Sequence, residues 1–165
     1  MIVAKRSVRR RRSARKTLSR AGRSTAATTR LRYVESSALV AALLEHAPAV
    51  SRAPVGTQHV TSALTLAEAG RAIIRARATG RLTPADEQAA VRALRTFERR
   101  CFIVDVDRAV LARVRRPFPL EPIRTLDAVH LATSELLGEA PQAVTIVTRD
   151  VRVRDNARAL GYIVE

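Results

Sequence analysis

Short runs rich in β-branched and aromatic residues alternate along the chain with longer stretches in which apolar residues recur at helical spacing. The short runs are residues 31–34, 58–61, 102–106, 143–148 and 162–164. Strands that alternate with helices in this way are typical of βαβ units, in which the connecting helix makes successive strands parallel. The pattern therefore predicts an α/β fold with a parallel central sheet.

The stretches between these runs contain recognisable helix starts. Ser36 or Ser37 can begin a helix directly after the first run. Thr83 followed by Pro84 combines an N-cap with a proline at the first helical position, and Asp107 can cap a short helix. The helices expected from these starts and from glycine or proline stops cover about residues 36–44, 64–78, 84–100, 108–116, 125–137 and 149–160.

Four carboxylates fall where such a sheet would bring them to one edge. Glu35 directly follows the first run and Asp150 follows the fourth, while Glu68 and Asp127 are expected in the first turns of helices that begin near the same edge. Ligands of open α/β sheets bind outside the carboxyl ends of the strands. Clustered carboxylates repel one another unless a cation neutralises them, and Mg²⁺ prefers oxygen ligands. The sequence therefore predicts a Mg²⁺ or Mn²⁺ site.

Each acid also has a purely structural interpretation. Glu68 ends a capping-box pattern that begins at Thr65, and Asp127 near a helix start is favoured by the helix dipole. Asp150 can simply cap the next helix, and Glu35 can be a solvated strand end. Taken singly, the structural interpretation leads for each acid. Their joint placement is what favours the metal site.

Other polar residues carry weaker signals. His130 follows the third acid on the same helix and is expected to be a packed or half-buried helix residue rather than a ligand. Arg71 and Arg75 share a helix face with Glu68, where they can bind phosphates or form a solvated basic face. Cys101, the single cysteine, excludes an internal disulfide and is expected to be a buried, inert thiol.

The net charge of +15 is concentrated at one end of the chain. Residues 1–30 hold eleven Lys or Arg and no acid, whereas residues 31–165 hold nineteen Lys or Arg and fifteen acids. We expect residues 1–30 to be a disordered basic extension, or the product of a start codon upstream of the true one, and residues 31–165 to form the folded domain. A polyanion partner follows from the charge. The chain has neither a secretory signal nor a run long enough to span a bilayer, so we expect a cytoplasmic protein without membrane contact.

Four segments resemble those that carry the acids of PIN-domain nucleases, particularly VapC-type toxins of type II toxin–antitoxin systems. They are residues 33–39 (Tyr-Val-Glu-Ser-Ser-Ala-Leu), 61–68 (Thr-Ser-Ala-Leu-Thr-Leu-Ala-Glu), 124–132 (Arg-Thr-Leu-Asp-Ala-Val-His-Leu-Ala) and 148–150 (Thr-Arg-Asp). The last is followed by residues 156–161, Asn-Ala-Arg-Ala-Leu-Gly, which also match the family pattern. The match covers residues 31–165 in the family's order and spacing.

This resemblance implies a PIN-like three-layer fold, with a central five-stranded parallel sheet flanked by helices. It also implies Mg²⁺-dependent RNA cleavage, a homodimer, and a small antitoxin that occludes the acidic pocket. Glu35, Glu68, Asp127 and Asp150 take the family's catalytic and metal-binding positions.

The chain departs from the family at Glu35, where Asp is usual. Octahedral Mg²⁺ tolerates displaced ligands poorly, so we expect reduced activity or a preference for Mn²⁺. The alternative is a weakened or inactive PIN-like domain that binds RNA or a protein partner.

Overall fold

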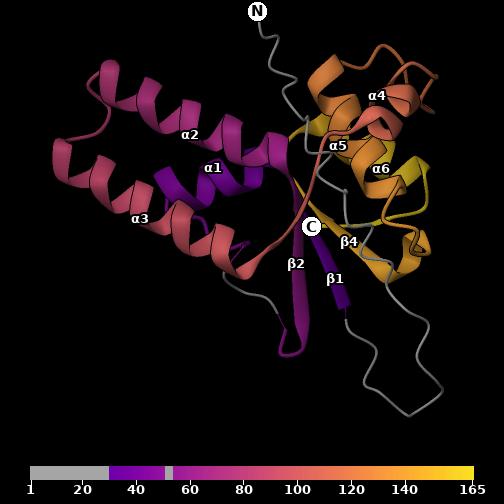
Figure 1. Cartoon of the computed structure of the whole chain (residues 1–165), viewed down its shortest axis with the longest axis horizontal. Helices are drawn as coiled ribbons and strands as arrows, with labels where there is room; N and C mark the ends of the chain where they lie inside the picture. Colours follow the sequence, from indigo (N-terminus) through magenta and orange to yellow (C-terminus); the bar gives the residue numbers. More distant parts are fainter. Residues whose placement is uncertain (1–29, 51–53) are drawn as a thin grey trace, which may run out of the picture.

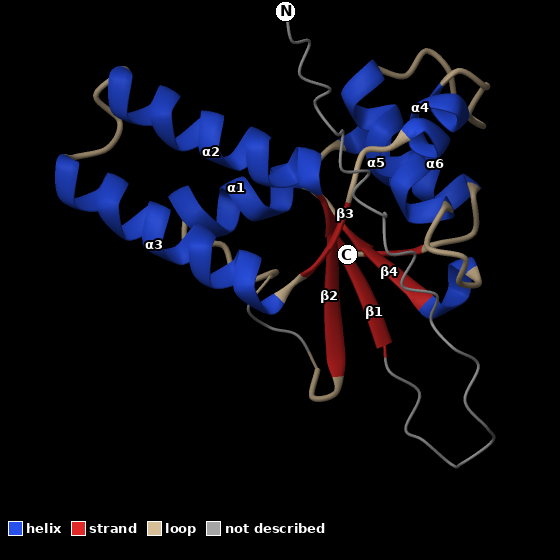
Figure 2. Cartoon of the chain, viewed as in Figure 1, coloured by secondary structure: helices blue, strands red, loops and turns tan. Residues whose placement is uncertain are grey.

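The computed structural model describes residues 30–50 and 54–165, in which five parallel strands form one sheet in the order β3-β2-β1-β4-β5 (Figure 2). The strands are β1 (Arg30–Val34), β2 (Thr57–Ser62), β3 (Phe102–Val104), β4 (Val144–Val147) and β5 (Ile163–Val164). The helices are α1 (Ser36–Leu44), α2 (Ala63–Ala78), α3 (Pro84–Arg100), α4 (Arg108–Val114), α5 (Thr125–Glu135) and α6 (Val151–Ala159), with a short 3₁₀ helix, η1 (Pro141–Ala143). The predicted α/β class and five-stranded parallel sheet are confirmed. The expected basic extension, residues 1–30, lies outside the described residues except for Arg30.

The helices form two layers, one on each side of the sheet. Helices α1, α2 and α3 group together on one side, and α4, α5 and α6 on the other (Figure 1). Adjacent residues of β1 serve different layers: Tyr33 belongs to the apolar cluster beneath α4–α6, and Val34 to the cluster beneath α1–α3. Ile146 and Val147 of β4 divide in the same way. Because successive side chains of a strand point to opposite faces, each strand supports both layers, and the predicted three-layer arrangement is confirmed.

Strand order places a topological switch point between β1 and β4. The chain leaves β1 for β2 on one side, whereas β4 pairs with the other side of β1. The backbone N–H of Glu35, directly after β1, donates to the carbonyl of Val147 at the end of β4 (3.0 Å). Crevices at such points are the usual ligand sites of open α/β sheets.

Local capping explains where several helices begin. Thr83 forms a reciprocal capping box with Asp86, and Asp107 accepts hydrogen bonds from the N–H groups of Ala109 (2.8 Å) and Val110 (3.0 Å), as predicted. Between α2 and α3, Gly80 adopts a φ of +72°, which other residues rarely accept. Within the described ranges, no helix combines the length and apolarity needed to cross a bilayer.

Two predictions near the site are wrong, the end of β3 and the place of Glu68 in the first turn of α2. Strand β3 ends at Val104 rather than continuing to residue 106, because its partner Ser62 is the last residue of β2. Ser62 also caps α2 by accepting a hydrogen bond from the N–H of Leu64 (3.2 Å). Helix α2 therefore starts before Thr65, so Glu68 lies in its second turn and not in its first, and the expected capping box does not form.

The central strand contains a buried arginine. Arg32 is 2% exposed, and its position two residues before Val34 places it on the α1–α3 side of the sheet. Its guanidinium forms an ion pair with the carboxylate of Glu165 and donates a hydrogen bond to the carbonyl of Ala49 (2.9 Å). The backbone carbonyl of Glu165 accepts from the N–H of Thr148 (3.0 Å), which holds the end of the chain beside β4.

Candidate active site

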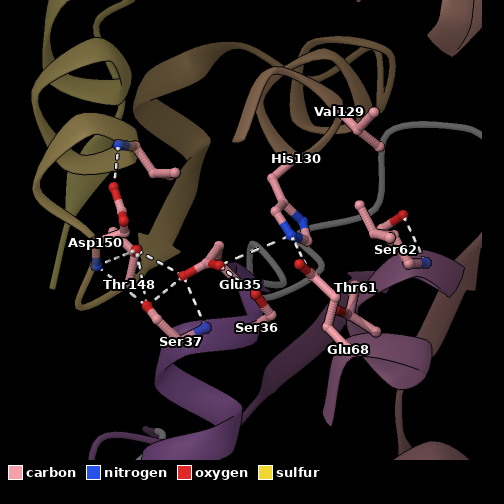
Figure 3. A network of polar contacts seen from close by, with 12 residues as sticks. Glu35, Ser36, Ser37, Thr61, Ser62, Glu68, Val129, His130, Thr148 and Asp150 are labelled. Carbon is pink, nitrogen blue, oxygen red and sulfur yellow. Dashed lines mark hydrogen bonds and ion pairs between the residues drawn. The ribbon is translucent and has the colours of Figure 1, made fainter. Parts of the chain in front are cut away.

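Glu35 is buried at the end of β1, with 3% of the residue exposed. Its carboxylate caps α1 by accepting hydrogen bonds from the N–H of Ser37 (3.0 Å), the hydroxyl of Ser36 (2.6 Å) and the hydroxyl of Ser37. The hydroxyl of Thr148, just after β4, donates to the same carboxylate (2.8 Å). The alternative interpretation of Glu35 as a solvated strand end is therefore wrong, because Glu35 is buried and joins the ends of β1 and β4 (Figure 3).

Asp150 lies on the other side of the switch point as the N-cap of α6. Its Oδ1 accepts hydrogen bonds from the N–H groups of Arg152 (2.8 Å) and Val153 (3.1 Å), so the capping interpretation is correct for this oxygen. Its own N–H donates to the hydroxyls of Ser37 (3.1 Å) and Thr148 (3.0 Å). Two of the three hydroxyls that bind Glu35 therefore also position Asp150.

Asp127 lies in the first turn of α5, as predicted. Its Oδ2 is buried and has no hydrogen-bond partner among the described residues. Burial raises the pKa of Asp127, and the nearby charges of Asp150 and Glu35 raise it further. Asp127 is therefore close enough to Asp150 and to Glu35 to be repelled by both carboxylates.

Glu68 reaches the same region from α2, which lies on the other side of the sheet from α5 and α6. Its Oε2 lies 2.9 Å from Nε2 of His130, which in turn lies 3.7 Å from Oε1 of Glu35. Burial alone raises the pKa of Glu68, but the hydrogen bond and attraction of His130, with a hydrogen bond from Ser36, leave it below its ordinary value. His130 thus connects Glu68 to the other acids.

His130 is 2% exposed, as expected for a packed helix residue, but its polar contacts were not predicted. Its Nδ1 lies 3.0 Å from the hydroxyl of Tyr33, a fully buried residue of β1. Burial raises the pKa of the Tyr33 phenol, and the charges of Glu35 and Glu68 add to the rise. The only sequence signal for these contacts is the spacing of His130 three residues after Asp127, which puts both on one side of α5.

The four predicted acids all lie around the carboxyl ends of β1, β2 and β4, although they do not form a closed cage. As the side chains stand, no three Asp, Glu, His or Cys residues in ranges 30–50 and 54–165 are arranged to hold one metal ion. The donor set nevertheless fits a hard cation, because every candidate ligand is a carboxylate oxygen. The unpartnered Oδ2 of Asp127 and the raised pKa of its carboxyl are the features that a bound cation would relieve.

The weaker candidates lie outside this cluster. Arg71 and Arg75 are exposed on α2, beyond Glu68. Cys101 is partly rather than fully buried, and burial raises the pKa of its thiol to about 12. Little of it ionises at neutral pH, which agrees with the expected inert thiol.

Comparison with known proteins identifies the fold that carries these acids. The model of the PIN domain family matches residues 32–159. The chain belongs to the PIN-domain family. The predicted membership of this family is therefore confirmed.

Two relatives and two solved structures are similar to this PIN domain. Ribonuclease VapC46 of Mycobacterium tuberculosis (strain ATCC 25618 / H37Rv) is 36% identical over 135 residues, which cover 80% of this chain and 94% of the relative. Ribonuclease VapC35 of M. tuberculosis (strain CDC 1551 / Oshkosh) is 35% identical over 105 residues, 64% of this chain and 70% of the relative. PAE2754 from Pyrobaculum aerophilum superimposes with a TM-score of 0.51 at 21% identity, covering 84% of this chain and 91% of its own. VapBC2 from Rickettsia felis, bound to a DNA fragment from its promoter, superimposes with a TM-score of 0.54 at 16% identity, covering 82% of this chain and 97% of its own.

Proposed function

We propose that this PIN domain is a divalent-metal-dependent endoribonuclease that cleaves RNA phosphodiester bonds, and that it is the toxin of a toxin–antitoxin pair. The observation that carries the proposal is the meeting of Asp127, Asp150 and Glu35 at the switch point, where Oδ2 of Asp127 is buried without a hydrogen-bond partner in the described part of the chain. Relatives named Ribonuclease VapC support RNA as the substrate.

In this proposal Glu35, Glu68, Asp127 and Asp150 hold the metal. When bound, Mg²⁺ or Mn²⁺ supplies a polarised phosphoryl oxygen and an activated water. Asp150, Ser37 and Thr148 contribute to the geometry of the site in different ways. The two cap bonds fix the carboxylate of Asp150, and its neighbours Ser37 and Thr148 hold the ends of β1 and β4 together.

Substrate positioning falls to exposed cations around the acids. Arg71 and Arg75 follow Glu68 by one and two turns of α2, so they extend away from the acids along one side of that helix. Contacts of this kind bind the phosphate backbone and set its position without selecting a base sequence. The arginines therefore suit an RNA strand that crosses the acidic site.

An Asp150→Asn variant tests the metal role separately from the capping role. Asn caps helices about as well as Asp, so the hydrogen bonds that start α6 can persist while the charge is lost. Cleavage of a labelled RNA by the purified protein should require Mg²⁺ or Mn²⁺, stop on chelation, and be lost in this variant. The matched control is Asp107→Asn, because Asp107 makes the same pair of cap bonds at α4. Equal cleavage by wild type and Asp150→Asn would place the activity elsewhere.

One observation favours a second candidate function, a catalytically weakened PIN-like domain that binds RNA or a protein partner. The carboxylate of Glu35 already accepts hydrogen bonds from Ser36, Ser37 and Thr148, and these compete with a metal ion. If the wild-type protein and a Glu35→Asp variant both fail to cut RNA with Mg²⁺ and Mn²⁺, this second function replaces the first.

The remaining partner proposals follow from the toxin assignment. We propose that a small antitoxin protein covers the acidic site and that the toxin is a cytoplasmic homodimer. The VapBC2 structure supports an antitoxin at the level of the fold. Sedimentation velocity of the purified chain, alone and co-expressed with the product of an adjacent short gene, tests both assemblies.

A further inference from the structure

His130 lies between three parts of the fold that are distant in sequence. Its Nδ1 is 3.0 Å from the hydroxyl of Tyr33 on β1, while His130 itself belongs to α5. Its Nε2 is 2.9 Å from Oε2 of Glu68 on α2 (Figure 3). Only 2% of the residue is exposed. The ring is therefore held at both nitrogens by protein groups.

The chemistry of these partners assigns the proton on the ring. Glu68, as a carboxylate, only accepts hydrogen bonds, so Nε2 of His130 must be the donor in that contact. Nδ1 faces the Tyr33 hydroxyl, which can donate or accept a hydrogen bond and is buried away from water. Both contacts are therefore satisfied when Nε2 carries a proton.

We propose that Tyr33 and His130 form a positioning pair, in which the phenol anchors the imidazole at Nδ1 and the N–H at Nε2 holds the Glu68 carboxylate at the acid cluster. This inference rests on the proposed metal-dependent nuclease. His130 is a positioning residue and not a metal ligand, because Nε2 is taken by Glu68 and Nδ1 by Tyr33.

The position of Glu68 explains why it needs such a partner. Asp127 and Asp150 are fixed by the starts of α5 and α6, and Glu35 by the start of α1. Glu68 lies in the second turn of α2, where no cap orients it, and 26% of its side chain is exposed. Fixed hydrogen-bond donors that orient ligands are a general feature of metal sites.

The tautomer can be measured in the metal-free wild-type protein. Long-range ¹H–¹⁵N correlation spectra of the ¹⁵N-labelled chain distinguish the two neutral tautomers and the imidazolium, and a His130→Gln spectrum assigns the His130 signals by their loss. The proposal predicts a proton on Nε2. A neutral ring that carries its proton on Nδ1 alone overturns it, whether or not the protein cleaves RNA.

Two substitutions of His130 distinguish a role in positioning Glu68 from a role in core packing alone. His130→Gln places an amide N–H near the position of Nε2, and so retains a donor to Glu68, whereas His130→Asn retains a group only near Nδ1. With Mn²⁺ alone as the calorimetric probe, we expect His130→Asn to weaken metal affinity about 10–100-fold. His130→Gln should recover most of that loss. Equal affinities in the two variants, or tighter binding by His130→Asn, overturn the proposal.

Tyr33→Phe provides a test that does not alter the histidine. It removes one hydroxyl, keeps the aromatic packing, and should weaken Mn²⁺ binding, because Nδ1 of His130 loses the group that anchors the ring. An Mn²⁺ affinity equal to that of wild type refutes the role of the phenol. His46→Asn is the matched control, because His46 is exposed, with a φ of 55° that Asn tolerates. If wild type itself binds no Mn²⁺, the proposed nuclease fails, and the tautomer spectrum still decides the pairing.

Discussion

Replacing Asp127 with Asn tests whether Asp127 is a metal ligand or an acid that only stabilises the start of α5. The pKa of Asp127 is raised by burial and then by Asp150 and Glu35, so its ionised form is less favourable in the folded state than in the unfolded state. Asn has nearly the same size and no charge. The variant should therefore lose a repulsive interaction in the metal-free protein.

The expected stability change is a balance of two terms. A charge in the first turn of α5 interacts favourably with the helix dipole by about 0.3–1 kcal/mol, and Asn loses that contribution. Relief of repulsion acts in the opposite direction, and because Asp127 is only partly buried, solvent screening limits it to about 1 kcal/mol. We expect a metal-free variant at least as stable as wild type. Cleavage should fall at least about 100-fold, since losing even an indirect contact of a metal site costs 10–100-fold.

The pH dependence of the free energy of unfolding tests the sign of this stability change independently. The ordinary pKa of Asp127 is 3.8 and its folded value is higher. Below about pH 4 the carboxyl is protonated in both states, so wild type and variant should differ least there. As the pH rises through the folded pKa, wild type loses stability that Asp127→Asn does not lose.

Urea unfolding without metal between about pH 4 and 7.5, with a parallel RNA cleavage assay in Mn²⁺, measures both effects. Asp155→Asn on the exposed side of α6 is the control. A variant that is less stable by the full dipole term and still cuts like wild type would show that Asp127 only starts a helix.

Three further changes test other parts of the molecule. Glu35→Asp should maintain or raise the cleavage rate in Mg²⁺, because the shorter side chain restores the usual ligand; a lower rate in the same assay contradicts this. Glu165→Gln should cost about 1–3 kcal/mol in urea unfolding, because the buried Arg32 loses its charged partner, whereas Glu139→Gln on the surface should cost nothing measurable. Deleting residues 1–29, which hold ten Lys or Arg, should leave the thermal midpoint unchanged but flatten the salt dependence of RNA binding in a titration; an unchanged slope excludes the extension from binding.

Local sequence patterns were sufficient for the order of elements and for several of their ends. Thr83 and Asp107 cap helices because capping depends on the N–H groups of the next few residues, which sequence reveals. Strand β3 was overextended because its length depends on β2, and Ser62 ends β2 by capping α2. Boundaries that depend on a neighbouring element are not contained in the local pattern.

The same distinction applies to the site. The placement of Glu35 and Asp150 after parallel strands predicted that they would share one edge, and they do. The orientation of the Glu35 carboxylate was not predictable, because it depends on Thr148, 113 residues later. His130 was expected to be an ordinary packed residue since helical periodicity reports burial, and its contact with Glu68 joins residues 62 positions apart.

Four consecutive residues at the end of β1 and just after it each contact a different part of the structure. Arg32 pairs with Glu165, Tyr33 meets His130, Val34 packs beneath α1–α3, and Glu35 binds the residues after β4. A slip of one residue reverses the face of every side chain in a strand. Inserting or deleting a single codon here would therefore break two apolar clusters, an ion pair and the acidic site at once. The exposed turn between α2 and α3 has no comparable set of contacts, so changes of length during evolution should accumulate there and avoid β1.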